Sequence, residues 1–378
     1  MNRFEQTLSR RTFVGGIVAA GVGMRVVQPS TAAADKTLRL LCWAGYDDPE
    51  ITKAFRDQTG FAVQSTYLGA NDEIFLDLRA GGLGTIDVVT PQNGVIADLV
   101  ASDLIQPLDY DRLPNSAGYL QRFHLPEWAV VDGKPYAAPF LWGTAPAVYN
   151  ADALPQPPEN WLDLLSSTYR GRLAIPDDGL GHFKIWNRAL GAADPVHVTQ
   201  SQLIRTTNVL VSLKAQQAIA LTADMTVITG LVASGAAWLS TIGWEAIPHS
   251  PTAAGARLKL AYPAPGCFSS CYSFCLAKDA PNLDAAYAFI DSLISPDVQA
   301  IAAAKLWRGT VNEQAISHLT NDAHALFPYD NLDPFFELNP LLGFPPLQEA
   351  GEGMATYVDW VEAWERVHFG KLGKPAGS

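Results

Sequence analysis

Hydrophobic positions in residues 37–91 follow two alternating patterns. Short runs rich in β-branched and aliphatic residues are typical of buried strands. Between them lie segments whose apolar residues recur every three or four positions, as on one face of a helix. The predicted order is strand, helix, strand, helix, strand, at residues 37–42, 50–60, 61–68, 70–82 and 85–91. This order predicts a parallel sheet covered by helices.

Two aromatic residues, Trp43 and Tyr46, stand in the short loop between the first strand and the first helix. Asp48 is placed to cap that helix, Pro49 to occupy its first position and Gly60 to end it. Because ligands bind at the carboxyl ends of strands in such sheets, the two aromatics can form a stacking surface for a ligand. The same rings can instead fasten the start of the helix, and the pattern leaves both interpretations open.

The rest of the chain continues with strands and helices and has no flexible linker. Strands are predicted at 173–176, 236–245 and around 267–275, and helices at 283–294, 296–305 and 354–367. A chain of 378 residues is long enough for two domains of ordinary size. Without a linker, the two domains are expected to share the chain through tight crossings.

The N-terminal stretch is predicted to be an export signal rather than part of the fold. Arg10 and Arg11 precede an apolar segment rich in Gly, Ala and Val, and Ala32–Ala34 offers a small-residue cleavage site. Residues 1–34 therefore read as a twin-arginine signal peptide, which directs the protein to the periplasm. No other apolar segment reaches the length needed to span a membrane, so direct membrane insertion is not expected.

Charge argues against some classes of partner. Residues 1–34 hold four of the 26 basic and one of the 38 acidic residues, which leaves 22 and 37 and a net charge of −15. An acidic surface of this kind disfavours nucleic acids and anionic membranes as partners.

Four cysteines, at positions 42, 267, 271 and 275, lie outside the signal. The last three are four residues apart in a segment that alternates like a strand, which predicts that they share one face. No histidine lies near them in the sequence. We therefore expect at most one disulfide and no metal site.

Several motifs occur in an order that points to one family. They include Trp43 to Tyr46, "DVVTP" at 87–91, "LIQPLD" at 104–109, "PFLWGT" at 139–144, "NWLDLLSSTYRGRLAIPDD" at 160–178 and "AAYAFIDSLISPDVQA" at 285–300. "GW" at 243–244 and the segment 308–312 continue the match. The chain resembles the solute-binding proteins of bacterial polyamine-type ABC importers, the spermidine/putrescine-binding family, over nearly all of residues 35–378.

The resemblance implies an α/β fold of two lobes, the type II periplasmic binding protein architecture, in which a hinge closes the lobes over a ligand. It also implies that the protein is a monomer. Its partners would be a small solute and the ABC permease subunits of the inner membrane. The implied crossings lie near 141–146 and 265–273; the first lobe comprises 35–142 and 273–320, and the second comprises 143–272 and 321–378.

The resemblance also implies which residues hold the ligand. In this family aromatic side chains from both lobes sandwich the ligand, and carboxylates pair with its ammonium groups. Trp43, Tyr46 and Trp244 match aromatic positions, and Asp178 matches an acidic position. Trp43 and Trp244 are expected to face each other across the cleft.

Other candidate positions depart from the family pattern. Gln92 and Gly94 replace a small hydroxyl residue and an aromatic, Gly181 replaces a second acid, Ser270 and Tyr272 stand where Trp and Asp are usual, and Arg308 replaces a tyrosine. Fewer carboxylates and an added guanidinium favour a smaller zwitterionic ligand, with its amine held by Asp178 and its anionic group by Arg308. Two simpler roles remain open: Arg308 in a salt bridge between the lobes or at the surface, and Asp178 as a helix cap.

An exported hydrolase and an iron-binding relative of the same two-lobed architecture are the competing functions. The sequence lacks G-x-S-x-G, H-E-x-x-H and P-loop motifs, and its seven histidines are scattered. It also lacks the adjacent tyrosine pair that an iron-binding relative would need. The prediction is a receptor for an amine-containing solute, without catalytic residues, cofactor or metal ligands.

Overall fold

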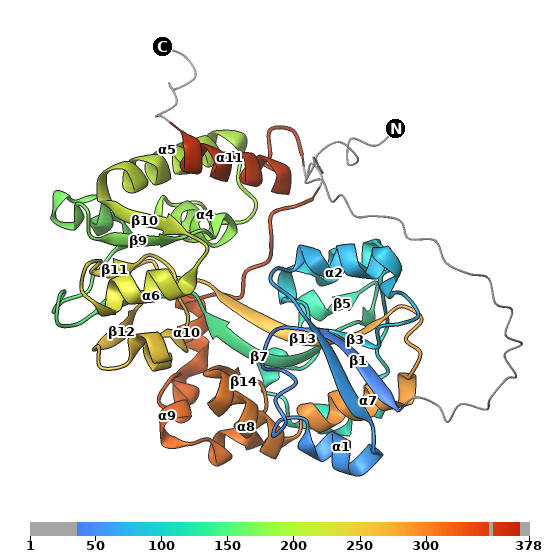
Figure 1. Ribbon diagram of the computed structural model, residues 1–378. Coiled ribbons are helices and arrows are strands. Elements are labelled where there is room, and N and C mark those ends of the chain that lie inside the picture. The colour runs from blue at the N-terminus through green and yellow to red at the C-terminus, as the bar shows by residue number, and fades with distance from the viewer. Residues whose placement is uncertain (1–35, 348–350, 371–378) are drawn as a thin grey trace, which may run out of the picture. The chain divides into compact units, whose positions relative to one another are not determined.

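The computed structural model describes residues 36–347 and 351–370, so the predicted signal at 1–34 lies outside the described residues. Two main sheets organise the described chain (Figure 1). We call the larger sheet and the helices packed on it the first lobe, and the smaller sheet with its helices the second lobe. A separate two-stranded ribbon pairs β5 (Val130–Val131) with β6 (Lys134–Pro135).

The larger sheet has the strand order β14-β7-β13-β3-β1-β2, and β4 also pairs with β13. As predicted, β1 pairs in parallel with β2 and β3. β13 runs antiparallel to β3, β4 and β7, and β14 runs antiparallel to β7. The bounds are β1 Thr37–Cys42, β2 Ala62–Tyr67, β3 Val88–Val89, β4 Ile105–Gln106, β7 Ala138–Thr144, β13 Ser269–Ala277 and β14 Gly309–Thr310.

The smaller sheet has the order β10-β9-β11-β8-β12. Its first three strands run parallel to one another, and β8 is antiparallel to both of its neighbours. The bounds are β8 Ala147–Asn150, β9 Leu173–Pro176, β10 Ala218–Thr222, β11 Leu239–Ser240 and β12 Leu258–Ala261.

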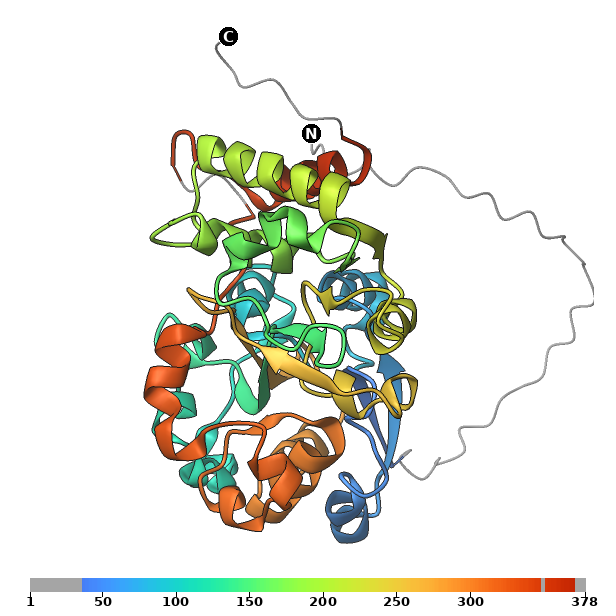
Figure 2. The ribbon, with the colours of Figure 1, turned by 90° about the vertical axis from the view of Figure 1, so that its left-hand side faces the viewer.

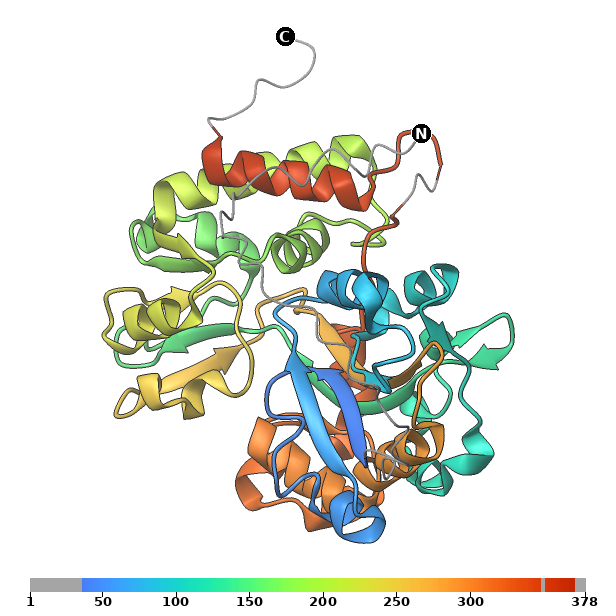
Figure 3. The ribbon, with the colours of Figure 1, turned by 45° about the vertical axis from the view of Figure 1, so that its right-hand side comes forward.

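Helices cover both sheets. In the first lobe they are α1 Lys53–Thr59, α2 Asp72–Asp77, α3 Ile96–Ala101, α7 Leu283–Leu293, α8 Pro296–Leu306, α9 Asn321–His324 and α10 Leu332–Leu338. In the second lobe they are α4 Gly179–Ala189, α5 Gln200–Gln217, α6 Met225–Ala233 and α11 Tyr357–Phe369. α11 lies along α5 (Figure 3), and the orange helices α7 to α9 lie toward the opposite end (Figures 1 and 2). None of the helices in 36–347 and 351–370 has the length and hydropathy to cross a bilayer.

Within the described ranges 36–347 and 351–370, the chain passes between the lobes at three places. β7 leads directly into β8 through residues 145–146, and β12 returns to β13 through residues 262–268. Phe327 and Phe336 belong to the core of the first lobe, whereas Trp360 belongs to that of the second. A third passage therefore lies between α10 and α11. Residues 321–338 pack with the first lobe, where the resemblance assigns them to the second; the other predicted boundaries stay predictions.

The first helix begins later than its sequence suggests. α1 starts at Lys53 after a run of turns, and the Asp48 carboxylate accepts a hydrogen bond from the Glu50 amide at 2.8 Å. Asp48 thus caps the preceding turn rather than the helix. Gly60 ends the helix as predicted, with a left-handed φ of 69° and its amide bonded to the Arg56 carbonyl.

The three clustered cysteines do not share one face, so that prediction was wrong. Alternate residues of β1 mark the two faces of the larger sheet: Leu40 packs in one core cluster and Leu41 in another. Cys271 lies in the first of these clusters and Cys275 in the second, because an irregularity between residues 272 and 273 shifts the register of β13. Cys267 precedes the strand and packs in the second lobe.

All four cysteines are buried and free in the structure, which leads to a first prediction. A thiol reagent should label none of them in the native mature protein and four after denaturation without reductant. Burial protects the thiols sterically and also raises the pKa of Cys42 to about 12, so the reactive thiolate is scarce. Fewer than four labelled thiols in the denatured sample would reveal a disulfide.

Candidate functional site

A cavity of about 370 Å³ lies between the two sheets. It sits where β2 and β3 of the larger sheet and β9, β10 and β11 of the smaller sheet reach their carboxyl ends, the usual ligand position in α/β folds. From the first lobe and the connections it is lined by Gly69, Gln92, Gly143, Thr144, Ala145, Phe268, Ser270, Tyr272 and Arg308. From the second lobe it is lined by Pro176, Asp177, Asp178, Ala223, Met225, Ile242, Gly243 and Trp244.

Six of the candidate residues named from the sequence meet in this cavity: Gln92, Asp178, Trp244, Ser270, Tyr272 and Arg308. The lining does not include Trp43 and Tyr46. Four of these six residues, Gln92, Ser270, Tyr272 and Arg308, depart from the family pattern. The aromatic Trp244 and the acid Asp178 follow it.

Trp43 and Tyr46 instead support Tyr272. The Trp43 indole donates a hydrogen bond to the Thr90 carbonyl at 2.8 Å, and its ring meets Tyr272 edge-on at 5.8 Å. Tyr46 is 4% exposed and packs edge-on against both Phe140 and Tyr272. Their loop therefore buttresses a lining residue, and a stacking of Trp43 and Trp244 about a ligand stays a prediction.

Gln92 holds the other side of Tyr272. Its amide nitrogen donates to the Tyr272 hydroxyl at 3.1 Å, and its amide oxygen accepts from the Asn71 side chain at 3.0 Å. The Gln92 backbone amide donates back to Asn71 at 3.0 Å. Asn71 precedes α2 without forming a side-chain cap, and it fixes Gln92 instead.

Two adjacent carboxylates form the opposite wall. Asp178 accepts a hydrogen bond from the Gly181 amide at 2.8 Å, so it caps α4, the simpler role considered for it, yet it remains exposed to the cavity. Asp177 accepts from the Trp364 indole at 2.6 Å and contacts His368 at 2.8 Å, both on α11. Burial opposes ionisation of Asp177, but the hydrogen bonds from His368 and Trp364 outweigh it and lower its pKa.

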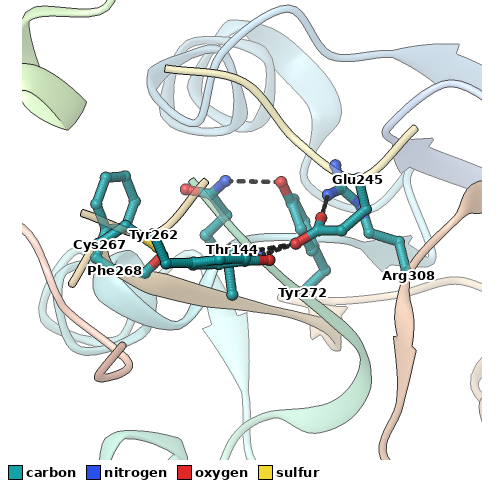
Figure 4. Close-up of polar contacts among 8 residues, drawn as sticks. Thr144, Glu245, Tyr262, Cys267, Phe268, Tyr272 and Arg308 are labelled. Atoms are coloured by element: carbon teal, nitrogen blue, oxygen red, sulfur yellow. Dashed lines mark hydrogen bonds and ion pairs between the residues drawn. The ribbon is translucent and has the colours of Figure 1, made fainter. Parts of the chain in front are cut away.

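Arg308 forms an ion pair between the lobes (Figure 4). Its Nη1 donates to Oε2 of Glu245 at 3.0 Å, and its guanidinium lies 5.5 Å from the centre of the Tyr272 ring. The other Glu245 oxygen accepts from the Thr144 amide at 2.8 Å and from the Thr144 hydroxyl. Of the two roles considered for Arg308, the salt bridge between lobes is therefore formed, and the residue also lines the cavity.

Sequence reasoning missed both Asp177 and Glu245. Glu245 is fully buried, and burial raises its pKa despite the opposing effects of Arg308 and Thr144. Burial alone would lower the pKa of Arg308, but Tyr272 and Glu245 outweigh it and raise the pKa. The available signals were an acid at the end of an apolar strand-like run, in "STIGWE", and a second acid beside Asp178.

The arrangement can hold a molecule with separated charges. Asp177 and Asp178 present acceptors suited to an ammonium group, and Tyr272 and Trp244 offer aromatic surface. Arg308 presents guanidinium donors on the other wall. Within the described part of the chain, no group of three His, Cys, Asp or Glu residues is arranged to hold a metal ion.

Comparison with known proteins gives one family and one fold. The family model described as bacterial extracellular solute-binding protein matches residues 50–327. The spermidine/putrescine-binding periplasmic protein of Salmonella typhimurium is 24% identical over 302 residues, which cover 77% of this chain and 80% of that protein.

Two solved structures share the fold. The substrate-binding protein PotD of a spermidine/putrescine ABC transporter from Streptococcus pneumoniae superposes with a TM-score of 0.71 at 20% identity, covering 88% of this chain and 97% of its own. The TpPotD lipoprotein of Treponema pallidum gives a TM-score of 0.74 at 20% identity, covering 88% and 99%. Both likenesses show the two-lobed architecture that the sequence predicted.

The Arg308–Glu245 pair leads to a second prediction. Arg308→Met should lower the free energy of unfolding by about 3–5 kcal/mol at neutral pH, because it leaves a buried carboxylate without its cationic partner. Glu245 has a raised pKa in the folded state, so the loss should be smallest at acid pH, where the carboxyl is protonated, and grow as pH rises through that folded pKa.

Denaturant unfolding at several pH values measures this effect, and Arg308→Met/Glu245→Gln is the matched control. The double variant removes both charges and should recover most of the lost stability. A single variant as stable as the wild type at every pH would contradict a structural role for the pair.

Proposed function

Because the chain belongs to the family of bacterial extracellular solute-binding proteins, we propose that it is the substrate-binding component of an ABC importer. It captures a small organic solute that contains an amine and delivers it to permease subunits in the inner membrane. The cavity between the lobes, with two carboxylates on one wall, is the observation that carries the proposal. The relative from Salmonella typhimurium is a spermidine/putrescine-binding protein, which supports an amine as ligand.

Two chemistries satisfy the cavity. A polyamine-like ligand would place one ammonium at Asp177 and Asp178 and its methylene chain against Trp244 and Tyr272. A zwitterionic amino compound would add an anionic group at Arg308. Glu245 already binds one edge of that guanidinium and offsets its charge. An anionic ligand group is therefore less favoured than it would be beside an unpaired Arg308.

We also propose how the protein is exported and how it works. We place the protein in the periplasm, exported through the twin-arginine signal at 1–34, where it works as a monomer. Closing of the lobes about the connections 145–146 and 262–268 would bury the ligand, and the closed form would dock on the permease. The protein is a receptor rather than a hydrolase, so a bound ligand should be recovered chemically unchanged after prolonged incubation.

A third prediction concerns Asp178. Calorimetry at fixed salt should detect binding of at least one compound among spermidine, putrescine, 4-aminobutyrate, taurine and 2-aminoethylphosphonate. Asp178→Asn should weaken that binding about tenfold or more, because an ammonium loses a charged partner. Asp330→Asn, at an exposed position on the first lobe, is the control and should bind like the wild type. If none of the five compounds binds, an amine solute is the wrong class.

The fourth prediction concerns Trp244, which is partly buried and lines the cavity. Trp244→Ala should cost about 1–3 kcal/mol of binding free energy if the ring is an anchor for the ligand. Far-ultraviolet circular dichroism checks that the variant folds. Unchanged affinity in a folded variant would remove Trp244 from the site. The same titration on Trp43→Ala tests whether the supporting ring also contributes.

A further inference from the structure

Glu245 lies outside the cavity lining but directly behind it. The residue follows β11 of the second lobe, is fully buried and reaches across to Arg308, which precedes β14 of the first lobe. Arg308 lines the cavity, whereas Glu245 does not. One partner of the ion pair therefore faces a ligand, and the other is inaccessible to it.

The backbone around the pair leaves space for it. A Cβ atom at Gly143 would stand 2.6 Å from Nη1 of Arg308 and 3.0 Å from Oε2 of Glu245. A side chain at this position of β7 would therefore displace the pair. Thr144, the next residue, donates two hydrogen bonds to Oε1 of Glu245, the oxygen that does not accept from Arg308. Both the space and the hydrogen bonds come from the end of one strand, so the carboxylate has a fixed orientation.

We propose that Glu245 is a positioning residue that sets which ligand charge the cavity accepts, by holding and neutralising Arg308. The inference rests on the proposed function, because it requires the cavity to be the solute site. Among residues 36–347 and 351–370, the Arg308 side chain makes one hydrogen bond, to Glu245. Its remaining donors are oriented by that bond and by the Tyr272 ring beneath the guanidinium.

The charge balance explains the expected selectivity. With Glu245 in place, the charges of the pair offset each other, and the other charged residues of the lining are Asp177 and Asp178. Such a cavity favours a cationic amine. Without Glu245, Arg308 becomes an uncompensated cation that repels an ammonium group and attracts an oxyanion. Glu245 would therefore decide between diamines and zwitterionic amino acids without touching either.

The test compares affinities for putrescine and for 4-aminobutyrate by calorimetry at one ionic strength. In Glu245→Gln, the ratio of putrescine affinity to 4-aminobutyrate affinity should fall about tenfold or more relative to the wild type. Arg308→Met should move the ratio the other way, and Glu245→Gln/Arg308→Met should return it toward the wild type. Glu313→Gln, which removes an exposed carboxylate, is the charge-matched control and should leave the ratio unchanged.

A ratio that Glu245→Gln leaves unchanged would overturn the inference while the proposed function stands. A role that is only structural would weaken both probes equally, so it predicts this same unchanged ratio. The selectivity measurement therefore separates positioning from folding.

A second measurement needs no organic solute. Sulfate should raise the melting temperature of Glu245→Gln more than that of Glu245→Gln/Arg308→Met, against sodium chloride of equal ionic strength, because an uncompensated Arg308 binds oxyanions. Equal responses of the two variants would overturn the inference. If neither solute binds the wild type, the proposed ligand class fails, and the sulfate comparison still decides the role of Glu245.

Discussion

Antiparallel pairing between β7 and β13 is the interaction on which the rest of the structure depends. Its register sets Gly143 beside Ser270 and Leu141 beside Tyr272, so one wall of the cavity consists of paired main chain. Both strands continue into connections with the second lobe, and the same ladder therefore fixes the distance between two of the three passages. β14 pairs with β7 at Trp142, which brings Arg308 to the end of the ladder. The cavity, the ion pair and both connections follow from one pair of strands.

Much of this arrangement could be predicted from sequence because strand ends are visible in it. Asp178 follows a buried strand and Trp244 follows another, and both line the cavity. Tyr46 follows a strand as well, but an aromatic ring at a strand end can turn inward, and it lies in the first-lobe core. The pairing of β13 with β7 and β3 was not predictable from alternation, and the irregularity within it moved Cys275 to the other face. Contacts between distant segments decide such outcomes.

Residues from distant segments also fill space at positions where the chain departs from the family motifs. Gly94 stands where an aromatic is usual, yet a Cβ atom there would lie 2.1 Å from the ring of Phe344, which occupies the space instead. The Lys184 ammonium lies 4.0 Å from the centre of the same ring and 4.9 Å from that of Phe268. Burial lowers the pKa of Lys184 to about 8. Phe344, in the third passage, thus supplies an aromatic ring to the first lobe at the position of Gly94 and contacts Lys184 of α4. Spacing along the chain does not reveal that a distant residue replaces the usual aromatic.

The placement of β13 has a consequence for the order of folding. This strand lies between β7 and β3 in the larger sheet, but it follows the whole of the smaller sheet in the sequence. During synthesis, β3 and β7 therefore remain without β13 between them while the second lobe emerges. Closing so long a loop is slow, and an unpaired strand edge can meet another chain in the meantime. The nascent first lobe consequently exposes an unpaired edge at β3 until β13 has been synthesised.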